Sequence, residues 1–224
     1  HMGRKHTKLN TEGYGGMIMS TWLDRPLSGA GRIIVSENGT LVSKLVNLDR
    51  TTLVIPSVAI HMDRTANGGH AWNIQQDLLP LYGTADDSLS FMDAVAAAAQ
   101  VAPENILGHD LYLYSRIEGT LWGERHEFIS SARLDDLQCA FAAFRGFTAG
   151  KKEKHICVYA LFDNEEVGSA TNQGAGATFL KNTLTRISRS LGYSYDETQA
   201  MIARSFMISA DNGHALHPNH GEYA

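Results

Sequence analysis

The sequence has little cysteine and no long apolar run. Among its 224 residues only Cys139 and Cys157 are cysteines, and each lies inside an apolar pattern. This favours buried, reduced thiols in a cytoplasmic protein over a disulfide framework. No apolar stretch approaches the roughly 18 residues that a membrane-spanning helix needs, so we expect no membrane protein.

The sequence also lacks a concentration of basic residues. Its formal net charge is −5, whereas a nucleic-acid surface calls for a basic patch. Hydrophobic content of 43% and charged content of 19% are typical of a globular protein with a sizeable core. We therefore expect peptides, small molecules or further copies of the chain as partners, and no nucleic acid.

The first half of the chain, residues 8–127, has the pattern of a β-rich domain. Asn38 and Gly39 separate two apolar runs, and Asn-Gly is a strong signal for a two-residue hairpin turn. A further strand is expected over residues 51–60. One helix interrupts this pattern, with Ser90 as its N-cap and Pro103 as its stop.

The second half, residues 128–224, alternates helix and strand patterns, which indicates an α/β domain. Apolar residues at helical spacing predict helices from about 133 to 147 and from about 176 to 191, and Ser194 with Glu197 forms a capping box for a third. Two apolar runs, 155–162 and 205–210, read as buried strands.

Acidic residues stand at the ends of three of these expected elements. Crowded carboxylates repel one another, so such a site generally needs cations, and carboxylates with imidazoles suit zinc, manganese or cobalt. The alternative for any single segment is a solvated acidic turn. The acids are Asp135 and Asp136 at a helix start, Glu165 and Glu166 after one strand, and Asp211 after the other.

Three histidines follow at intervals of three residues in the stretch "ADNGHALHPNH". Pro218 blocks helical continuation between the last two, which argues against an independent three-histidine metal site. His214 is the nearest to Asp211 and could hydrogen-bond a substrate carbonyl, while His217 and His220 are expected to be loop residues with local partners.

Seven ordered blocks of sequence resemble the aspartyl aminopeptidase family of dinuclear zinc exopeptidases, from Lys8 to Tyr223. The resemblance implies the central part of a zinc-exopeptidase-like α/β catalytic domain at 128–224 and an inserted β-rich lid or dimerisation domain at 8–127. The blocks are "TEGYGG", "STWLDRPLSGAGR", "IPSVAIHMDR", "DLLPLYG", "ARLDDLQCAF", "DNEEVGS" and "SADNGHALHPN".

The resemblance also implies roles for single residues. Asp135 looks like the carboxylate that bridges two divalent metal ions, with Glu166 a ligand of one metal and Asp211 a ligand of the other. The family implies zinc, with manganese or cobalt as the alternatives. Glu165 looks like the general base that takes a proton from a metal-bound water and returns it to the leaving amine. The implied substrate is a peptide with an amino-terminal Asp or Glu.

Two histidines of the chain match further family positions. His214 looks like the residue that contacts the transition state. His61 resembles a histidine that members insert into the active site of a neighbouring subunit, which would make the protein a homo-oligomer. The plainer alternative for His61 is a strand-end histidine bonded to backbone.

The chain departs from the family pattern at both ends. Members carry one metal-ligating histidine before the "EGYGG" block and another well after "HPN", and this sequence contains neither. We therefore expect weak metal occupancy, no activity from this polypeptide alone, and exposed apolar surface that drives association. Two alternatives remain open: a non-catalytic oligomerisation module derived from such an enzyme, and a related dinuclear hydrolase such as a deacylase.

Overall fold

The computed structural model describes residues 6–84, 90–151 and 153–223. The chain divides into two compact units, His1–Ala132 and Arg133–Ala224. The boundary predicted from the sequence, between the β-rich domain and the α/β domain, lies slightly earlier, between residues 127 and 128. Each unit is described by itself.

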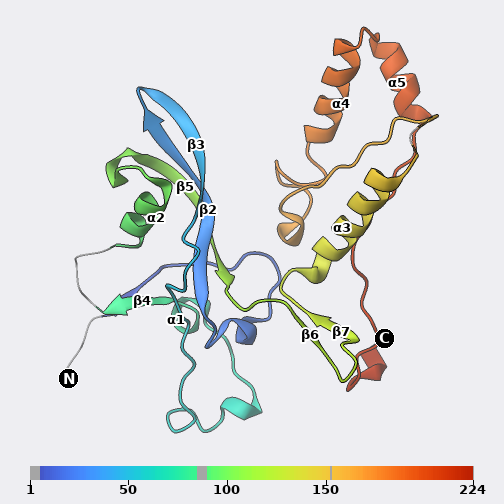
Figure 1. Ribbon diagram of the computed structural model, residues 1–224. Coiled ribbons are helices and arrows are strands. Elements are labelled where there is room, and N and C mark those ends of the chain that lie inside the picture. Colours follow the sequence, from blue (N-terminus) through green and yellow to red (C-terminus); the bar gives the residue numbers. More distant parts are fainter. Residues whose placement is uncertain (1–5, 85–89, 152, 224) are drawn as a thin grey trace. The chain divides into compact units, whose positions relative to one another are not determined.

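A three-stranded antiparallel sheet forms the frame of the first unit (Figure 1). The strand order is β3 (Thr40–Asn47), β2 (Leu27–Glu37) and β5 (Ile106–Ser115). Asn38 and Gly39 join β2 to β3 with φ values of 51° and 75°, the positive values that a tight hairpin turn needs. The predicted hairpin is confirmed.

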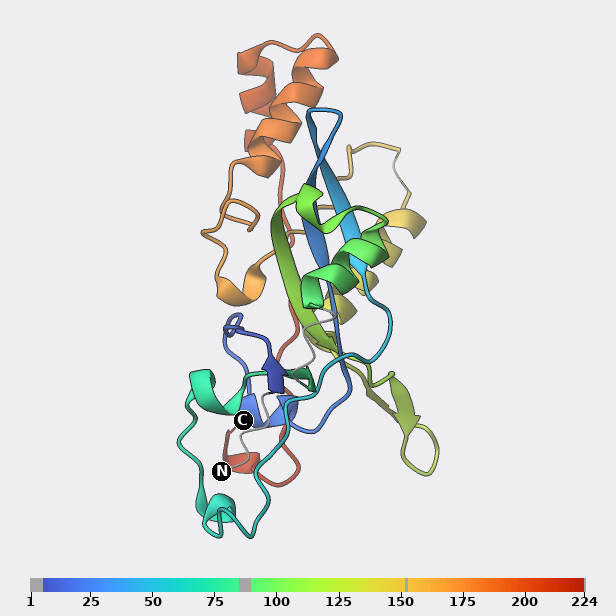
Figure 2. The ribbon, with the colours of Figure 1, turned by 90° about the vertical axis from the view of Figure 1, so that its left-hand side faces the viewer.

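Helix α2 (Phe91–Ala99) packs on one face of this sheet (Figure 2). Its Val95 is buried against Ile33, Val35 and Val46. As predicted, Ser90 caps the helix, but the helix ends before Pro103, because Gln100 adopts the left-handed conformation with φ 56°.

A second apolar cluster lies at the other end of the sheet and contains Leu27, Leu53, Ile55 and Leu78. The strand expected over residues 51–60 is reduced to isolated bridges, such as that of Leu53 with Leu27. The shorter elements of the unit are β1 (His6–Lys8), η1 (Met19–Trp22), η2 (Ala66–Gly68), α1 (Ile74–Asp77), β4 (Leu81–Thr84), η3 (Pro103–Asn105), β6 (Thr120–Trp122) and β7 (Phe128–Ser130).

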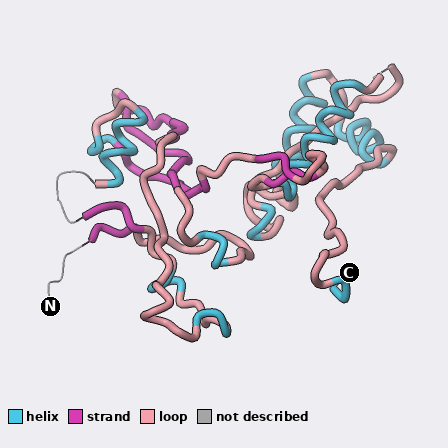
Figure 3. Tube along the Cα trace, turned by 60° about the horizontal axis from the view of Figure 1, so that its bottom comes forward, coloured by secondary structure: helices cyan, strands magenta, loops and turns pink. Residues whose placement is uncertain are grey.

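The second unit consists of helices joined by long extended segments (Figure 3). Helices α4 (Phe179–Ser190) and α5 (Tyr195–Ala203) form a hairpin in which the buried hydroxyls of Ser188 and Thr198 lie 2.6 Å apart. The predicted capping box of Ser194 and Glu197 opens α5. The elements are α3 (Leu134–Ala149), η4 (Glu165–Val167), α4 (Phe179–Ser190), α5 (Tyr195–Ala203) and η5 (Gly221–Tyr223).

The two strands predicted for this unit are not formed. Residues 155–162 and 205–210 are extended, but in the described part of the chain neither joins a β-ladder. A strand requires a hydrogen-bonded neighbour, and without one the apolar side chains stay exposed, by 78% at Ile156 and 87% at Phe206.

The prediction of buried cysteines is also wrong. Cys157 lies in the unpaired segment 155–162 and is exposed, while Cys139 in α3 is only half-buried, and both are free thiols.

Within the described residues, no helix combines the length and the apolar character that a membrane crossing would require.

Candidate functional site

All but one of the predicted site residues lie in the second unit. Asp135 stands in the first turn of α3, Glu165 and Glu166 open η4, and Asp211 and His214 lie in the extended segment that follows α5. The remaining residue, His61, is exposed in a loop of the first unit.

The carboxyl groups of Asp135 and Asp211 interact, although 76 positions separate them in the sequence. Their hydrogen bond is the largest cause that raises the pKa of Asp135, followed by partial desolvation and by repulsion from the charges of Asp211 and Asp136. A positive charge on His214 acts in the opposite direction. The structure thus brings together the helix start and the late extended segment, as the acidic pattern predicted.

Glu165 lies within the electrostatic reach of the same cluster. Partial desolvation is the largest cause that raises its pKa, and repulsion from Glu166, Asp211 and Asp135 adds to it. The protonated form of Glu165 is therefore more stable here than in an ordinary surface glutamate. The general-base role that the resemblance implied for Glu165 stays a prediction.

Side-chain hydrogen bonds of Asn212 hold the Asp211 segment against α3. The Asn212 Oδ1 accepts from the backbone N–H of Cys139 at 3.3 Å, and its Nδ2 donates to Oε1 of Gln138 at 3.2 Å. The thiol of Cys139 donates to the carbonyl of Asp211 at 3.3 Å. These contacts hold Asn212, and with it the adjacent Asp211, against the turn of α3 that follows Asp135.

The segment that leads to Glu165 is held in a similar way. The hydroxyl of Tyr159 donates to the carbonyl of Ala140 in α3 at 2.9 Å, and the backbone N–H of Asp163 donates to the carbonyl of Gln173 at 3.3 Å. Tyr159 and Asn212 are positioning residues that the sequence did not reveal, because each acts on a partner far away in the chain.

Left-handed backbone precedes both acidic turns. Arg133 and Asn164 each have φ 61°, two residues before Asp135 and one before Glu165. Asparagine tolerates this region, whereas arginine enters it at a cost, and such conformations concentrate at functional sites. The chain thus changes direction sharply just before each acidic turn.

The donor set fits a divalent cation in its chemistry. A hydrogen-bonded carboxyl pair next to further acids is an arrangement that a cation relieves of its repulsion. The geometry is incomplete, however, since the described residues gather no group of three or more His, Cys, Asp or Glu side chains able to hold one metal ion.

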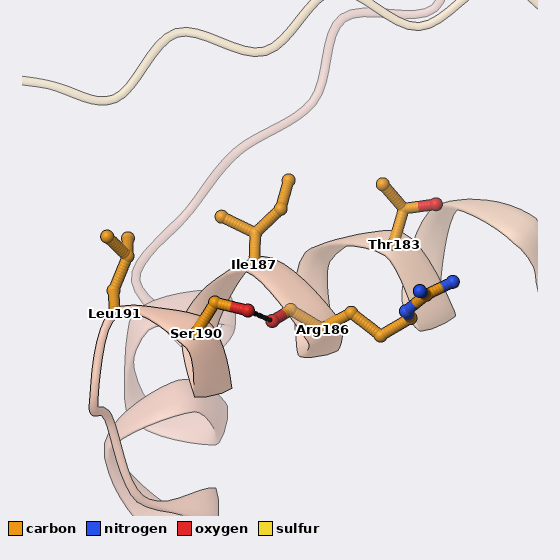
Figure 4. Close-up of a pocket in the computed structure, with 5 residues that line it drawn as sticks. All are labelled: Thr183, Arg186, Ile187, Ser190 and Leu191. Carbon is orange, nitrogen blue, oxygen red and sulfur yellow. Dashed lines mark hydrogen bonds between the residues drawn. The ribbon is translucent and has the colours of Figure 1, made fainter.

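Two neighbouring features do not contribute to this site. His217 accepts a hydrogen bond from the backbone of Asn219 at 3.2 Å, and His220 lies 3.1 Å from Glu222, so both histidines have the local partners expected of loop residues. The pocket in Figure 4 runs along α4 and contains none of the predicted site residues. Its lining residues are Thr183, Arg186, Ile187, Ser190 and Leu191.

Comparison with known proteins identifies the family. The profile described as "Aminopeptidase I zinc metalloprotease (M18)" matches residues 2–223. The chain belongs to this family. It is 45% identical over 225 residues to "Probable M18 family aminopeptidase 2" of Clostridium acetobutylicum, and the alignment covers 98% of this chain and 52% of that relative. It is 32% identical over 260 residues to "Aspartyl aminopeptidase 4" of Saccharomyces cerevisiae, with 98% and 53% covered.

Solved structures of M18 aminopeptidases have a similar fold. A chain of the cryo-EM structure of the Ape4 and Nbr1 complex matches with a TM-score of 0.85 and 33% identity, over 98% of this chain and 47% of that one. The mApe1 dodecamer of S. cerevisiae matches with a TM-score of 0.73 and 27% identity, over 97% and 51%.

The M18 comparisons confirm the mixed α/β fold and the resemblance to the aspartyl aminopeptidases. The chain spans about half the length of the curated relatives it matches.

Proposed function

We propose that this chain supplies the central catalytic acids of a cytoplasmic, zinc-dependent M18 aminopeptidase that removes amino-terminal Asp or Glu from peptides. The observation that carries the proposal is the junction of two acidic segments, since Asn212, next to Asp211, bonds to Cys139 and Gln138 of the helix that holds Asp135. Interactions among these acids raise the pKa of Asp135 and of Glu165. The M18 family membership supports zinc as the metal and an aminopeptidase as the reaction class.

In this proposal Asp135, Glu166 and Asp211 are the residues that would hold the zinc. When bound, the metal would supply Lewis acidity for the scissile carbonyl and for a water molecule. Manganese or cobalt would suit the same oxygen-rich donor set.

The remaining roles belong to side chains of this chain. The Glu165 carboxylate takes a proton from the attacking water and returns it to the amine that leaves. His214 donates a hydrogen bond to the carbonyl oxygen of the substrate as charge develops there. The raised pKa of Glu165 suits this exchange of a proton in both directions.

We further propose that the active protein is a homo-oligomer in which His61 reaches the active site of a neighbouring subunit. His61 is exposed and therefore accessible to a partner. The S. cerevisiae mApe1 to which this chain is similar is a dodecamer, which supports assembly in this family.

The 224-residue chain by itself is expected to be inactive. Its described residues do not gather three ligands around one point, and a catalytic zinc site normally takes three from the protein. This feature also favours the second candidate function, a non-catalytic oligomerisation module derived from such an enzyme.

The test compares this chain with a protein extended at both ends to the length of its relatives. Release of amino-terminal Glu, Asp and Leu from short peptides is measured with added zinc, alongside a Glu165→Gln variant of each protein. The proposal requires zinc-dependent release of Glu or Asp by the extended protein and its loss in the variant.

Other outcomes separate the alternatives. An extended protein that assembles but releases no amino acid would support the oligomerisation module. Cleavage of an acylated amine in preference to a free amino terminus would indicate a deacylase. Substantial zinc-dependent activity of the 224-residue chain would contradict its expected inactivity.

A further inference from the structure

His70 lies between two carboxylates on the surface of the first unit. Its Nε2 donates to Oδ2 of Asp77 at 3.1 Å, and its Nδ1 lies 3.9 Å from Oδ2 of Asp63. All three side chains are partly sheltered, with exposed fractions of 37% for His70, 31% for Asp63 and 25% for Asp77. The imidazole thus bridges two acids that are 14 positions apart.

These two acids belong to different structures, a short helix and a loop. Asp77 ends helix α1, where its Oδ2 also accepts from the backbone N–H of Asn73 at 2.7 Å. That bond, followed by the bond from His70, lowers the pKa of Asp77, so the carboxylate stays charged and able to accept both. Next to Asp77, Leu78 is buried in an apolar cluster.

Asp63, in contrast, belongs to the loop of residues 58–72 that carries His61, here named the His61 loop. The described backbone hydrogen bonds within this loop are local, such as those from Met62 and Asp63 to the carbonyl of Ala59. Asp63 extends this local order, since its Oδ1 accepts from the backbone N–H of Thr65 at 3.1 Å. Local bonds give the loop a shape but do not attach it to the core.

The surroundings of His70 supply that attachment. The ring of His70 meets the ring of Trp72 edge to face, with centroids 4.7 Å apart. Trp72 packs against the apolar cluster that contains Leu78. Contacts therefore run from the core, through Trp72 and His70, to Asp63, two residues from His61.

We propose that His70 is a positioning residue that fixes the His61 loop to helix α1 and so sets the place from which His61 reaches a neighbouring subunit. The link to catalysis rests on the proposed function of His61. The attachment of the loop stands on the contacts of His70 alone.

Trypsin offers a direct test, because Arg64 is an exposed cleavage site inside the His61 loop. Cleavage requires the loop to detach and enter the protease, so its rate reports local opening. The rate at Arg64 is measured in the 224-residue chain by mass spectrometry. Arg125, which is exposed in the turn between β6 and β7 of the same unit, serves as the internal reference.

The loss of one hydrogen bond to a charged group predicts that His70→Ala raises cleavage at Arg64 roughly fivefold relative to Arg125. His70→Gln retains a donor at the distance of Nε2 and should restore most of the protection. His70→Asn, whose amide reaches only the position of Nδ1, should restore little, because only Nε2 lies within hydrogen-bond distance of a carboxylate, at 3.1 Å from Asp77 against 3.9 Å between Nδ1 and Asp63.

Hydrogen exchange provides the second readout at His61 itself. The amides of Met62 and Asp63 should exchange faster in His70→Ala and return towards wild type in His70→Gln. Unchanged cleavage and exchange in His70→Ala would overturn the proposal, as would equal behaviour of the Gln and Ala variants. Faster cleavage at both Arg64 and Arg125 would also overturn it, since it would mean general unfolding.

This experiment measures no enzymatic activity. Its failure would therefore refute the role of His70 and leave the proposed aminopeptidase function intact. Conversely, absence of activity in the extended protein would leave the attachment of the His61 loop unaffected.

Discussion

The side chain of Asn212 accepts a hydrogen bond from the backbone N–H of Cys139 at 3.3 Å, which joins segments 73 residues apart. The thiol of Cys139 returns a bond to the carbonyl of Asp211. Because the two contacts are side by side, the placement of Asp211 on α3 and the protection of the Cys139 thiol depend on the same side chain.

This relationship predicts the reactivity of the two cysteines. Exposed Cys157 should be alkylated faster than half-buried Cys139 in the wild-type chain. Asn212→Ala should raise the labelling rate of Cys139 roughly fivefold, the effect of losing one hydrogen bond of about 1 kcal/mol. Mass spectrometry measures both rates, with Cys157 as internal reference and Asn219→Ala as the matched control. An unchanged ratio of rates in Asn212→Ala would show that Asn212 does not hold this segment.

The capping box of α2 predicts a pH dependence of stability. Asp93 accepts from the backbone N–H of Ser90 at 2.9 Å, and this bond, followed by the side-chain bond with Ser90, lowers the pKa of Asp93. A carboxyl group whose pKa is lowered by folding stabilises the protein above its unfolded pKa of about 3.9 and loses that effect as the pH falls through the folded value.

The difference in unfolding free energy between wild type and Asp93→Asn should therefore be larger at pH 7 than at pH 3. Urea denaturation at both pH values measures it, and Glu104→Gln, which removes an exposed acid of the same unit, is the control. A difference that is constant across this range, or that grows towards pH 3, would contradict the role assigned to the box.

Elements with local signals could be predicted from the sequence. The turn at Asn38 and Gly39 and the capping boxes at Ser90 and Ser194 each depend on residues within a few positions, and all three are present. The segments 155–162 and 205–210 were wrongly predicted as strands, because apolar composition indicates burial but cannot supply a hydrogen-bonded partner.

The candidate site shows the same contrast between features with a local sequence signal and features that depend on distant residues. Acids at the ends of elements were visible in the sequence, and the structure places the segment of Asp211 against the helix that holds Asp135. The residues that hold these segments in place could not be recognised in the sequence. Asn212 and Tyr159 act on backbone groups of α3, and neither residue type carries a signal of a distant partner.

Gly31 is required by the close approach of β5. A Cβ atom at this position would lie 2.1 Å from the carbonyl oxygen of Asp110 and 2.9 Å from Cα of Leu111. Gly31→Ala should lower the free energy of unfolding by about 2 kcal/mol or more, since backbone must move to admit the methyl group. Gly108→Ala on β5, where nothing lies within 4 Å of the added atom, is the matched control. Equal midpoints in urea denaturation for the two variants would refute the constraint at Gly31.

The unpaired segment 205–210 predicts self-association of the chain. Phe206, Met207 and Ile208 are exposed by 87%, 80% and 80%, and their backbone forms no ladder within the described residues. Extended apolar segments with free backbone groups pair readily with other chains. Sedimentation velocity should therefore show oligomers whose share increases with concentration.

A single charge on this segment should reduce that association. Ile208→Lys places a cation where two apolar surfaces would meet, whereas Gln75→Lys adds the same charge at an exposed position of the first unit and serves as the control. The monomer fraction should rise in Ile208→Lys and stay near the wild-type value in Gln75→Lys. A wild-type chain that sediments as a clean monomer at high concentration would refute association altogether, and an equal effect of both lysines would place its cause in net charge instead of in the 205–210 segment.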